Sequence, residues 1–277
     1  MFELETYLAG VHRPLVMGIV NATGDSFSEG AASSPQTALN RALRLLDEGA
    51  DLLDIGGEST RPGSAVVPPA EEIARVMPLI RELRRVRPSA VLSIDTRKSE
   101  VAAAALEYRV EIVNDVAMLR YDPRLAEVTA AGGAALVLSH SRGTPQTMRD
   151  PVWCDYGDDV AGTVVAELKE AARAAVAAGV PENNLLYDPG FGFAKRPEQD
   201  WELLKRVDEL HELGPVLAGL SRKSMLGWLL GQPDAAERLA GTVAASLYLA
   251  DRSVEIIRVH DVRQVCDALK VREKLLS

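Results

Sequence analysis

Residues 90–115 read AVLSIDTRKSEVAAAALEYRVEIVND, and the fold class follows from the pattern in this stretch. Its two ends, AVLSIDT (90–96) and VEIVND (110–115), are nearly continuous runs of apolar, often β-branched residues. Such runs are typical of strands that are buried on both faces. A longer segment separates them, so we predict two parallel strands joined by a helix in a right-handed crossover.

The same alternation occurs eight times along the chain. The other expected strands are VMGIVNA (16–22), DLLDIGG (51–57), AALVLSH (134–140), NLLYDPG (184–190), PVLAGLS (215–221) and VEIIRVH (254–260). Eight such units predict an α/β fold of the (β/α)8 TIM barrel type rather than an open doubly wound sheet. We expect a single domain over residues 1–277, in which residues 1–14 are an N-terminal extension, either a hairpin or a plug under the barrel.

Composition excludes several classes of protein. The 277 residues include 31 basic and 40 acidic side chains, a net charge of −9, so we expect no nucleic-acid partner. No apolar run reaches the roughly 20 residues of a membrane helix, and we expect no membrane partner. The acidic start MFELETYLAG is unlike an export signal, and two cysteines form no disulfide framework. These features predict a cytoplasmic protein.

A polar residue lies at the end of every expected strand. The carboxyl ends of barrel strands meet at one mouth, where barrel enzymes carry their chemistry, so we predict a functional site there. In chain order these residues are Asn21, Asp54 with Glu58, Asp95, Asn114 with Asp115, His140, Asp188, Ser221 with Arg222 and Lys223, and Arg258 with His260 and Asp261.

Three features indicate what this mouth binds. The segments ESTRPG (58–63) and SRKS (221–224) carry hydroxyls and cations that suit phosphate oxygens. SRKSMLGWLLG predicts a helix whose first amides attract a carboxylate, although Ser221 or Ser224 could equally cap that helix. Asp95, Asn114 and Asp188 suit a heterocycle with a guanidine-like edge, or alternatively take part in hydrogen bonds among the strand ends inside the barrel.

Other polar residues and cysteines give no clear indication of a catalytic or metal-binding role. Asp54 is as readily a structural acceptor that holds the ESTRPG loop. His140 has no second histidine or cysteine nearby, so we read it as a polar group lining the mouth rather than a metal ligand. Cys154 and Cys266 lack an activating pattern, and no nucleotide-binding glycine loop occurs.

The sequence resembles the dihydropteroate synthase family over essentially its whole length. The resemblance rests on seven blocks in order, MGIVNATGDSFSEG, DIGGESTRPG, SIDT, IVND, YDPGFGF, GLSRKS and RVHDV. It implies a barrel enzyme, usually a homodimer, that joins 4-aminobenzoate to (7,8-dihydropterin-6-yl)methyl diphosphate. Diphosphate leaves with help from Mg²⁺ in an SN1-like reaction.

The resemblance also implies roles for individual residues. The catalytic group would be Asp95, Lys223, Arg258 and His260. The pterin would lie among Asp95, Asn114, Asp188, Phe193 and Lys223, under Arg258. Arg258, His260, Thr60 and Arg61 would surround the diphosphate, with Asn21 as the protein ligand of Mg²⁺. The 4-aminobenzoate would contact Phe27, Pro62 and Ser224.

The chain departs from the family pattern at several positions. Gly24 stands where Pro is usual, Ser139 and Ser141 flank His140 where methionines are usual, and Ala194 replaces a glycine. The expected ligand positions are intact, so we keep the enzymatic interpretation. Two alternatives remain: a pterin-binding methyltransferase barrel, which has no use for the STRPG, SRKS and RVHD segments, and a relative that binds pterin without turnover.

Overall fold

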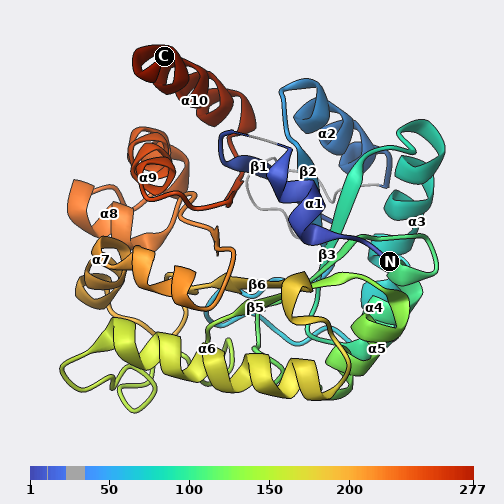
Figure 1. The fold of residues 1–277 in the computed structure, drawn as a ribbon, viewed down its shortest axis with the longest axis horizontal. Coiled ribbons are helices and arrows are strands. Elements are labelled where there is room, and N and C mark those ends of the chain that lie inside the picture. Colours follow the sequence, from blue (N-terminus) through green and yellow to red (C-terminus); the bar gives the residue numbers. More distant parts are fainter. Residues whose placement is uncertain (11, 23–34) are drawn as a thin grey trace.

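A computed structural model of the chain describes residues 1–10, 12–22 and 35–277. Within these residues, eight parallel strands form one sheet (Figure 1). They are β1 (Leu15–Asn21), β2 (Leu52–Gly56), β3 (Val91–Asp95), β4 (Ile112–Asp115), β5 (Ala135–Ser139), β6 (Leu185–Asp188), β7 (Leu217–Ala218) and β8 (Ile256–Val259). The expected barrel is confirmed.

The sheet closes into a barrel because its two end strands also meet. The strand order is β6-β5-β4-β3-β2-β1-β8-β7, and a parallel bridge between Tyr187 and Val216 joins β6 to β7. β7 has two residues, far fewer than the expected strand at 215–221. Pro215 lacks the N–H that a ladder needs, and Gly219 gives no side chain to pack, which explains the short strand.

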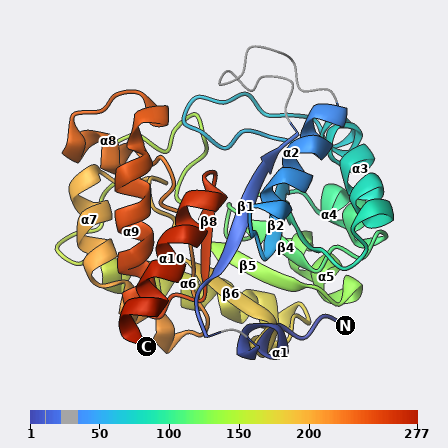
Figure 2. The same ribbon diagram turned by 90° about the horizontal axis from the view of Figure 1, so that it is seen from above.

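Helices surround the barrel and cover the outer faces of the strands (Figures 1 and 2). The α-helices are α1 (Leu4–Ala9), α2 (Pro35–Asp47), α3 (Pro69–Val86), α4 (Ser99–Leu106), α5 (Arg124–Gly132), α6 (Val160–Ala177), α7 (Pro197–Lys205), α8 (Ser224–Leu230), α9 (Leu239–Asp251) and α10 (Val262–Leu276). Short 3₁₀ turns are η1 (Glu182–Asn184), η2 (Val207–Glu212) and η3 (Ala235–Arg238). No helix in the described part of the chain is long and apolar enough to cross a membrane.

The interior of the barrel has an apolar layer at one end and a polar layer at the other. Side chains alternate along each strand, so every second residue points inward. The inward residues near the strand starts form one apolar cluster: Leu15, Met17, Leu52, Ile112, Ala135, Val137, Leu186, Leu217 and Ile256. The inward residues near the strand ends include Asp54, Asp95, Asn114, Ser139, Asp188 and Arg258. This layering places the polar groups at the mouth.

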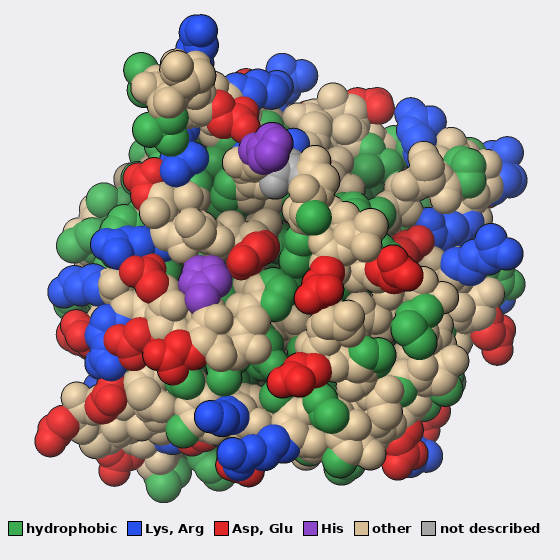
Figure 3. All heavy atoms as spheres, in the orientation of Figure 1, with side chains coloured by type: hydrophobic (Ala, Val, Ile, Leu, Met, Phe, Trp, Pro, Cys, Tyr) green, Lys and Arg blue, Asp and Glu red, His purple; other side chains and the backbone are tan. Residues whose placement is uncertain are grey.

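Residues Leu4–Ala9 form helix α1, not a hairpin. Leu4 is fully buried in the apolar cluster at the strand starts, and its N–H donates to Asn184 Oδ1 at 3.1 Å. Figure 2 shows α1 at the end of the barrel where the strands begin. Figure 3 shows the face that carries α1, on which acidic and basic side chains are interspersed.

Candidate active site

Arg258 on β8 joins the carboxylates of two neighbouring strand ends. Its Nε donates to Asp54 Oδ2 at 2.6 Å and its Nη2 donates to Asp95 Oδ2 at 2.7 Å. Asp54 is fully buried and its Oδ1 has no hydrogen-bond partner in the described structure. A partly buried guanidinium between two carboxylates forms a rigid, charge-assisted centre for the mouth.

A chain of hydrogen bonds continues around the barrel from this centre. Asn114 Nδ2 donates to Asp54 Oδ2 at 3.0 Å. The Ser139 hydroxyl lies 3.4 Å from Asn114 Oδ1 and 3.2 Å from Asp188 Oδ2. The expected heterocycle ligands are therefore brought together, and they also hydrogen-bond within the barrel, as the alternative interpretation held.

Asp54 is a structural acceptor, as one of the two interpretations held, but the part of that interpretation that placed it on the ESTRPG loop is wrong. Asp54 points into the barrel, because it alternates with Ile55 on β2, and it binds Asn114 and Arg258 instead. Glu58 holds the loop. It lies beyond the strand end, and its Oε1 accepts from the Val67 N–H at 2.8 Å.

Burial sets the charge of the acidic groups in the mouth. Burial raises the pKa of Asp95 to about 7, against the opposing effect of Arg258. Burial also raises the pKa of Asp188, while the Gly190 amide and the positive charge of Lys223 lower it. Perturbed carboxylates in a concave site are typical of catalytic centres.

Lys223 and Phe193 form a second wall beside these carboxylates. Lys223 immediately precedes α8, and its Nζ lies 4.3 Å from the centroid of the Phe193 ring. Burial lowers the pKa of Lys223, and Asp188 opposes that effect. An ammonium is attracted to the face of an aromatic ring, so these two side chains hold each other in place as one wall.

His260 lies where several arginines converge. Its backbone N–H donates to Ser221 Oγ at 3.1 Å, and the same hydroxyl lies 3.0 Å from Nδ1 of the ring. Burial lowers the pKa of His260 well below its usual value, and four arginines lower it further: Arg258, Arg222, Arg41 and Arg61. A neutral histidine in such a positive field suits an anion.

The start of α8 is not capped by either serine. The hydroxyl of Ser221 pairs with His260. Ser224 is the exposed first residue of the helix, so the N-cap position belongs to Lys223, whose side chain forms no capping hydrogen bond. Arg222 has a positive φ of 59° and forms a two-bond ion pair with Asp261. Both serines are thus left free of the capping role that the sequence allowed.

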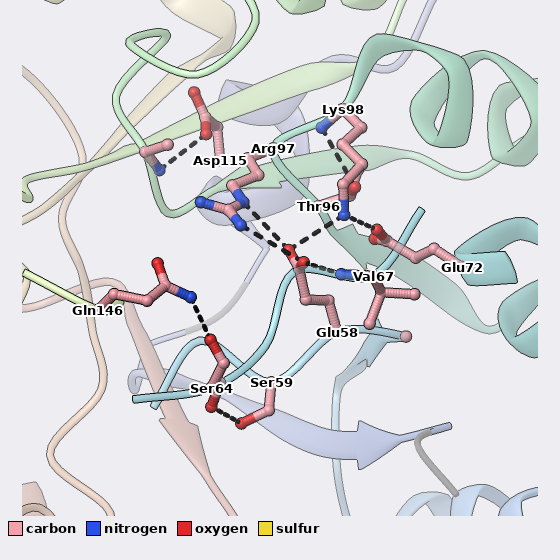
Figure 4. A network of polar contacts seen from close by, with 12 residues as sticks. Glu58, Ser59, Ser64, Val67, Glu72, Thr96, Arg97, Lys98, Asp115 and Gln146 are labelled. Atoms are coloured by element: carbon pink, nitrogen blue, oxygen red, sulfur yellow. Dashed lines mark hydrogen bonds and ion pairs between the residues drawn. The ribbon is translucent and has the colours of Figure 1, made fainter. Parts of the chain in front are cut away.

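The loop after β2 is held by a buried cluster of charges, shown in Figure 4. Glu58 accepts from Arg97 Nε at 3.0 Å and lies 3.1 Å from Lys98 Nζ, and Lys98 also pairs with Glu72. Further along the loop, the Gly63 N–H donates to Pro145 O at 2.7 Å. The loop is thereby fixed at its base and at its tip.

This loop carries Thr60, Arg61 and Pro62 to the mouth. Thr60 and Phe193 line the same cleft, although their positions in the sequence are far apart. Arg61 and Pro62, the next two residues of the loop, are exposed. The cleft is lined by Thr60, Arg97, Val116, Ala117, Ser141, Arg142, Gly143, Thr144, Pro145, Met148 and Phe193.

Asn21, the last residue of β1, is exposed at the mouth. No three His, Cys, Asp or Glu side chains gather as metal ligands in the described ranges. Mg²⁺ is often held through few protein oxygens together with substrate phosphates, so an amide oxygen at a phosphate site fits it. Gly24 and Phe27 lie outside the described residues.

The expectation that His140 lines the mouth is wrong. His140 follows the inward-pointing Ser139 and therefore points outward, where it is fully buried. Its Nδ1 lies 2.9 Å from Lys195 Nζ and its Nε2 lies 3.2 Å from Glu167 Oε2. Burial lowers the pKa of His140 to about 3.

Sequence reasoning missed Lys195, Arg41 and the Glu58 cluster. Lys195 lies two residues beyond the quoted block YDPGFGF, and its place directly after this glycine-containing segment was a usable signal. Arg41 is one of several arginines on amphipathic helices, and nothing in the sequence sets it apart.

Comparisons with known proteins agree on one family. The profile of the family described as "Pterin binding enzyme" matches residues 17–260. A dihydropteroate synthase of Neisseria meningitidis is 43% identical over 274 residues, covering 96% of this chain and 94% of that protein.

Solved structures give the same result. The dihydropteroate synthase of Xanthomonas albilineans with 4-aminobenzoic acid superimposes with a TM-score of 0.88 and 44% identity, covering 96% of this chain and 94% of that one. That enzyme in complex with 7,8-dihydropteroate gives a TM-score of 0.85 and 42% identity, covering 96% and 95%. A Yersinia pestis dihydropteroate synthase with a sulfonamide drug gives 0.89 and 39%, covering 97% and 95%.

Proposed function

The chain belongs to the pterin-binding enzyme family as a dihydropteroate synthase, and from that premise we propose how its residues divide the reaction between them. The enzyme is a transferase of folate biosynthesis. It condenses 4-aminobenzoate with (7,8-dihydropterin-6-yl)methyl diphosphate to 7,8-dihydropteroate and diphosphate.

The continuous hydrogen-bonded layer at the mouth is the observation that carries the proposal. Asp95, Asn114 and Asp188 present acceptors and an amide around one space, and these match the donor-rich edge of a pterin. Lys223 and Phe193 close one side of that space. The bicyclic ring stacks under the Arg258 guanidinium, which the two buried carboxylates keep in place.

The leaving diphosphate lies on the side of His260. The imidazole ring is neutral and lies among arginines. It can therefore donate a hydrogen bond to the diphosphate while the arginines supply the positive charge. Arg258, Arg61 and the Thr60 hydroxyl add further donors from the neighbouring strand and loop. Stabilisation of the leaving group by such fixed donors is the main catalytic contribution we assign to this side.

The C–O bond to diphosphate breaks before the new C–N bond forms. The methylene carbon becomes a cation that is delocalised into the dihydropterin ring, and the ionised carboxylate of Asp95 stabilises it. The amine of 4-aminobenzoate attacks this carbon, and the ammonium that forms then loses its proton to solvent. Phe27, Pro62 and Ser224 are the residues we assign to the aminobenzoate, with its carboxylate toward the start of α8.

A Mg²⁺ ion bound at Asn21 and the diphosphate would neutralise the charge of the leaving group. The amide oxygen of Asn21 accounts for the protein's share of that site. We expect Asn21→Ala to raise the Mg²⁺ concentration needed for half-maximal rate by about tenfold, since an amide ligand is lost. Titration of Mg²⁺ in a steady-state assay measures this, and an unchanged half-saturation point removes Asn21 from the site.

Release of diphosphate that depends on 4-aminobenzoate tests the proposed function. A coupled assay with the pterin diphosphate should show release that saturates in both substrates. Pterin binding by calorimetry without any release would favour a relative that binds without turnover. Methyl transfer to a corrinoid would favour the methyltransferase barrel, although ESTRPG, SRKS and RVHD are the segments that hold the diphosphate in our assignment.

We also propose a homodimer in the cytoplasm. Three apolar residues at the end of α8, Trp228, Leu229 and Leu230, are between 45% and 59% exposed, and neighbouring exposed apolar side chains are typical of an interaction surface. Both cysteines are free and buried, which suits a reducing compartment. Sedimentation equilibrium should give twice the chain mass, and Trp228→Glu should shift it toward the monomer; a monomeric wild type contradicts the dimer.

A further inference from the structure

The turn after β6 has an unusual backbone. Residues 189–195 read PGFGFAK, and three of them have a positive φ: Gly190 at 66°, Gly192 at 76° and Ala194 at 51°. A Cβ on Gly190 would lie 1.8 Å from the His140 carbonyl oxygen, so the turn packs directly on the end of β5. Ala194 adopts the left-handed region although its Cβ disfavours it. A group beyond the turn itself, which comprises residues 189–194, must therefore hold it in this shape.

Lys195 is the residue that holds it. Its Nζ is 3.1 Å from the Gly190 carbonyl oxygen and 3.2 Å from the Phe193 carbonyl oxygen, at the two ends of the turn. Its third partner is His140 Nδ1 at 2.9 Å, and the residue is 8% exposed. An ammonium has three N–H groups, so these three acceptors satisfy it completely.

His140 and Glu167 fix the direction of the ammonium. Because His140 Nδ1 accepts from Lys195, its Nε2 carries the proton and donates to Glu167 Oε2 at 3.2 Å. Glu167 is held in turn by Arg120 at 2.7 Å and by Arg142. Lys195 is thus attached to the end of β5 and to α6, both of which lie outside the turn.

The turn transmits its position to the pterin wall. The Phe193 ring lies 4.3 Å from Lys223 Nζ, and a Cβ on Gly192 would lie 3.4 Å from Lys223 Cδ. The Gly190 N–H donates to Asp188 Oδ1 at 2.8 Å. A shift of the turn would therefore move Phe193 and loosen both Lys223 and Asp188.

We propose that Lys195 is a positioning residue for the pterin pocket: with His140 and Glu167 behind it, its ammonium clamps the 189–194 turn so that Phe193, Lys223 and Asp188 face the pterin. Lys195 acts through these residues and does not itself face the reacting atoms. The inference rests on the proposed function, because that function assigns the pterin to this wall.

Lys195→Met tests the clamp, since methionine keeps the length of the side chain but donates nothing. The control is Lys205→Met on α7, where the lysine side chain is 70% exposed. We expect KM for the pterin diphosphate to rise about tenfold, with KM for 4-aminobenzoate unchanged within about twofold. Hydrogen exchange of the ligand-free protein should be faster at the amides of residues 190–194 and unchanged in Lys205→Met.

A rescue separates clamping from general stability. Adding Ala194→Gly to Lys195→Met should recover about threefold in the pterin KM, because glycine adopts the left-handed region without help. If Lys195→Met does not fold, His140→Ala replaces it as the test. This variant leaves both carbonyl partners of Lys195, so the pterin KM should rise by less than in Lys195→Met, and the KM for 4-aminobenzoate should again stay unchanged. A general loss of stability would raise both KM values together and would not respond to Ala194→Gly.

The outcomes are distinguishable from a failure of the proposed function. The clamp is overturned if the wild type is active and Lys195→Met changes neither the KM for the pterin diphosphate nor the hydrogen exchange at residues 190–194. A wild type that releases no diphosphate overturns the proposed function instead. In that case exchange at residues 190–194 alone decides whether Lys195 holds the turn, and unchanged protection overturns it.

Discussion

At the scale of single residues, Asp95 is the group whose charge state the fold controls most directly. Burial raises its pKa to about 7, the Arg258 guanidinium opposes this, and Asp54, Glu72 and Glu58 add to it. The folded protein therefore binds this proton over the range between the ordinary carboxyl pKa and about 7, where the unfolded chain does not. By linkage, stability through Asp95 falls as pH rises across that window.

Catalysis should follow the ionised form of Asp95. We expect kcat/KM of the wild type to fall as pH decreases below about 7, approaching tenfold per pH unit, because a neutral acid cannot stabilise the pterin cation. Asp95→Asn should be at least about tenfold slower at pH 8 and should lack this acid limb. A pH–rate profile of both proteins measures the effect, and an acid limb that persists in Asp95→Asn assigns the titration to another group.

Residue identity at strand ends was the part of the site that the sequence predicted best. Asp95, Asn114, Asp188 and Arg258 meet because inward positions of parallel strands meet wherever the barrel closes. The same reasoning gave a wrong prediction for His140, which lies one position beyond the inward-pointing Ser139. A single step along a strand reverses the direction of a side chain, and the sequence does not mark where the strand ends.

At the scale of elements, the loop after β2 is held by charged side chains from the segment between β3 and α4 and from helix α3. Glu58, Arg97 and Lys98 have side chains that are 5%, 7% and 1% exposed. Glu58 and Arg97 are 39 positions apart in the sequence. The pairing is a product of β2 and β3 lying side by side, so local sequence patterns carry no trace of it.

Removing the charge of Glu58 should loosen this loop. Glu58→Gln keeps an acceptor for the Val67 N–H but leaves Arg97 and Lys98 with one carboxylate fewer, which should cost about 1–3 kcal/mol of stability. Because Thr60 and Arg61 then lose their fixed position, KM for the pterin diphosphate should rise severalfold. Thermal melts and steady-state kinetics measure both effects.

Glu71→Gln on α3 is the matched control. Glu71 pairs with Arg75 on the surface and its side chain is 53% exposed, so it should change neither quantity appreciably. In the contrary outcome, Glu58→Gln destabilises the protein while its KM for the pterin diphosphate equals that of the wild type. That result would show that the buried cluster stabilises the fold alone and that the loop does not need it to bind phosphate.

At the scale of the whole molecule, stability and chemistry occupy opposite ends of one barrel. The apolar cluster fills the interior at the strand starts, while the carboxylates and Arg258 fill it at the strand ends. The alternation of apolar runs predicted the barrel as a whole, since every strand is buried on both faces. It could not predict α1, because a six-residue helix has too short a pattern to be distinguished from a turn.

Helix α1 closes the apolar end through Leu4, with Tyr7 and Leu8 also packed against the apolar cluster, and through a few hydrogen bonds. Leu4 is fully buried among inward residues of the strands. Asn184 accepts from the Leu4 N–H at 3.1 Å and donates to Phe2 O at 2.8 Å, and the Phe2 N–H donates to Gly133 O at 2.7 Å. These contacts tie α1 to η1 and to the end of α5, away from the mouth.

Leu4→Ala should therefore separate stability from activity. Emptying a buried leucine site should cost about 2–5 kcal/mol, or about 2–4 °C in Tm for each kcal/mol. The matched control is Leu275→Ala, because Leu275 is 81% exposed near the C-terminus. Well below the melting temperature, kcat and both KM values of Leu4→Ala should equal those of the wild type, since the residues at the opposite face of the barrel carry its chemistry. A Leu4→Ala protein whose pterin KM rises along with its loss of stability would show that the apolar layer transmits its packing to the mouth, and that the two ends of the barrel are not independent.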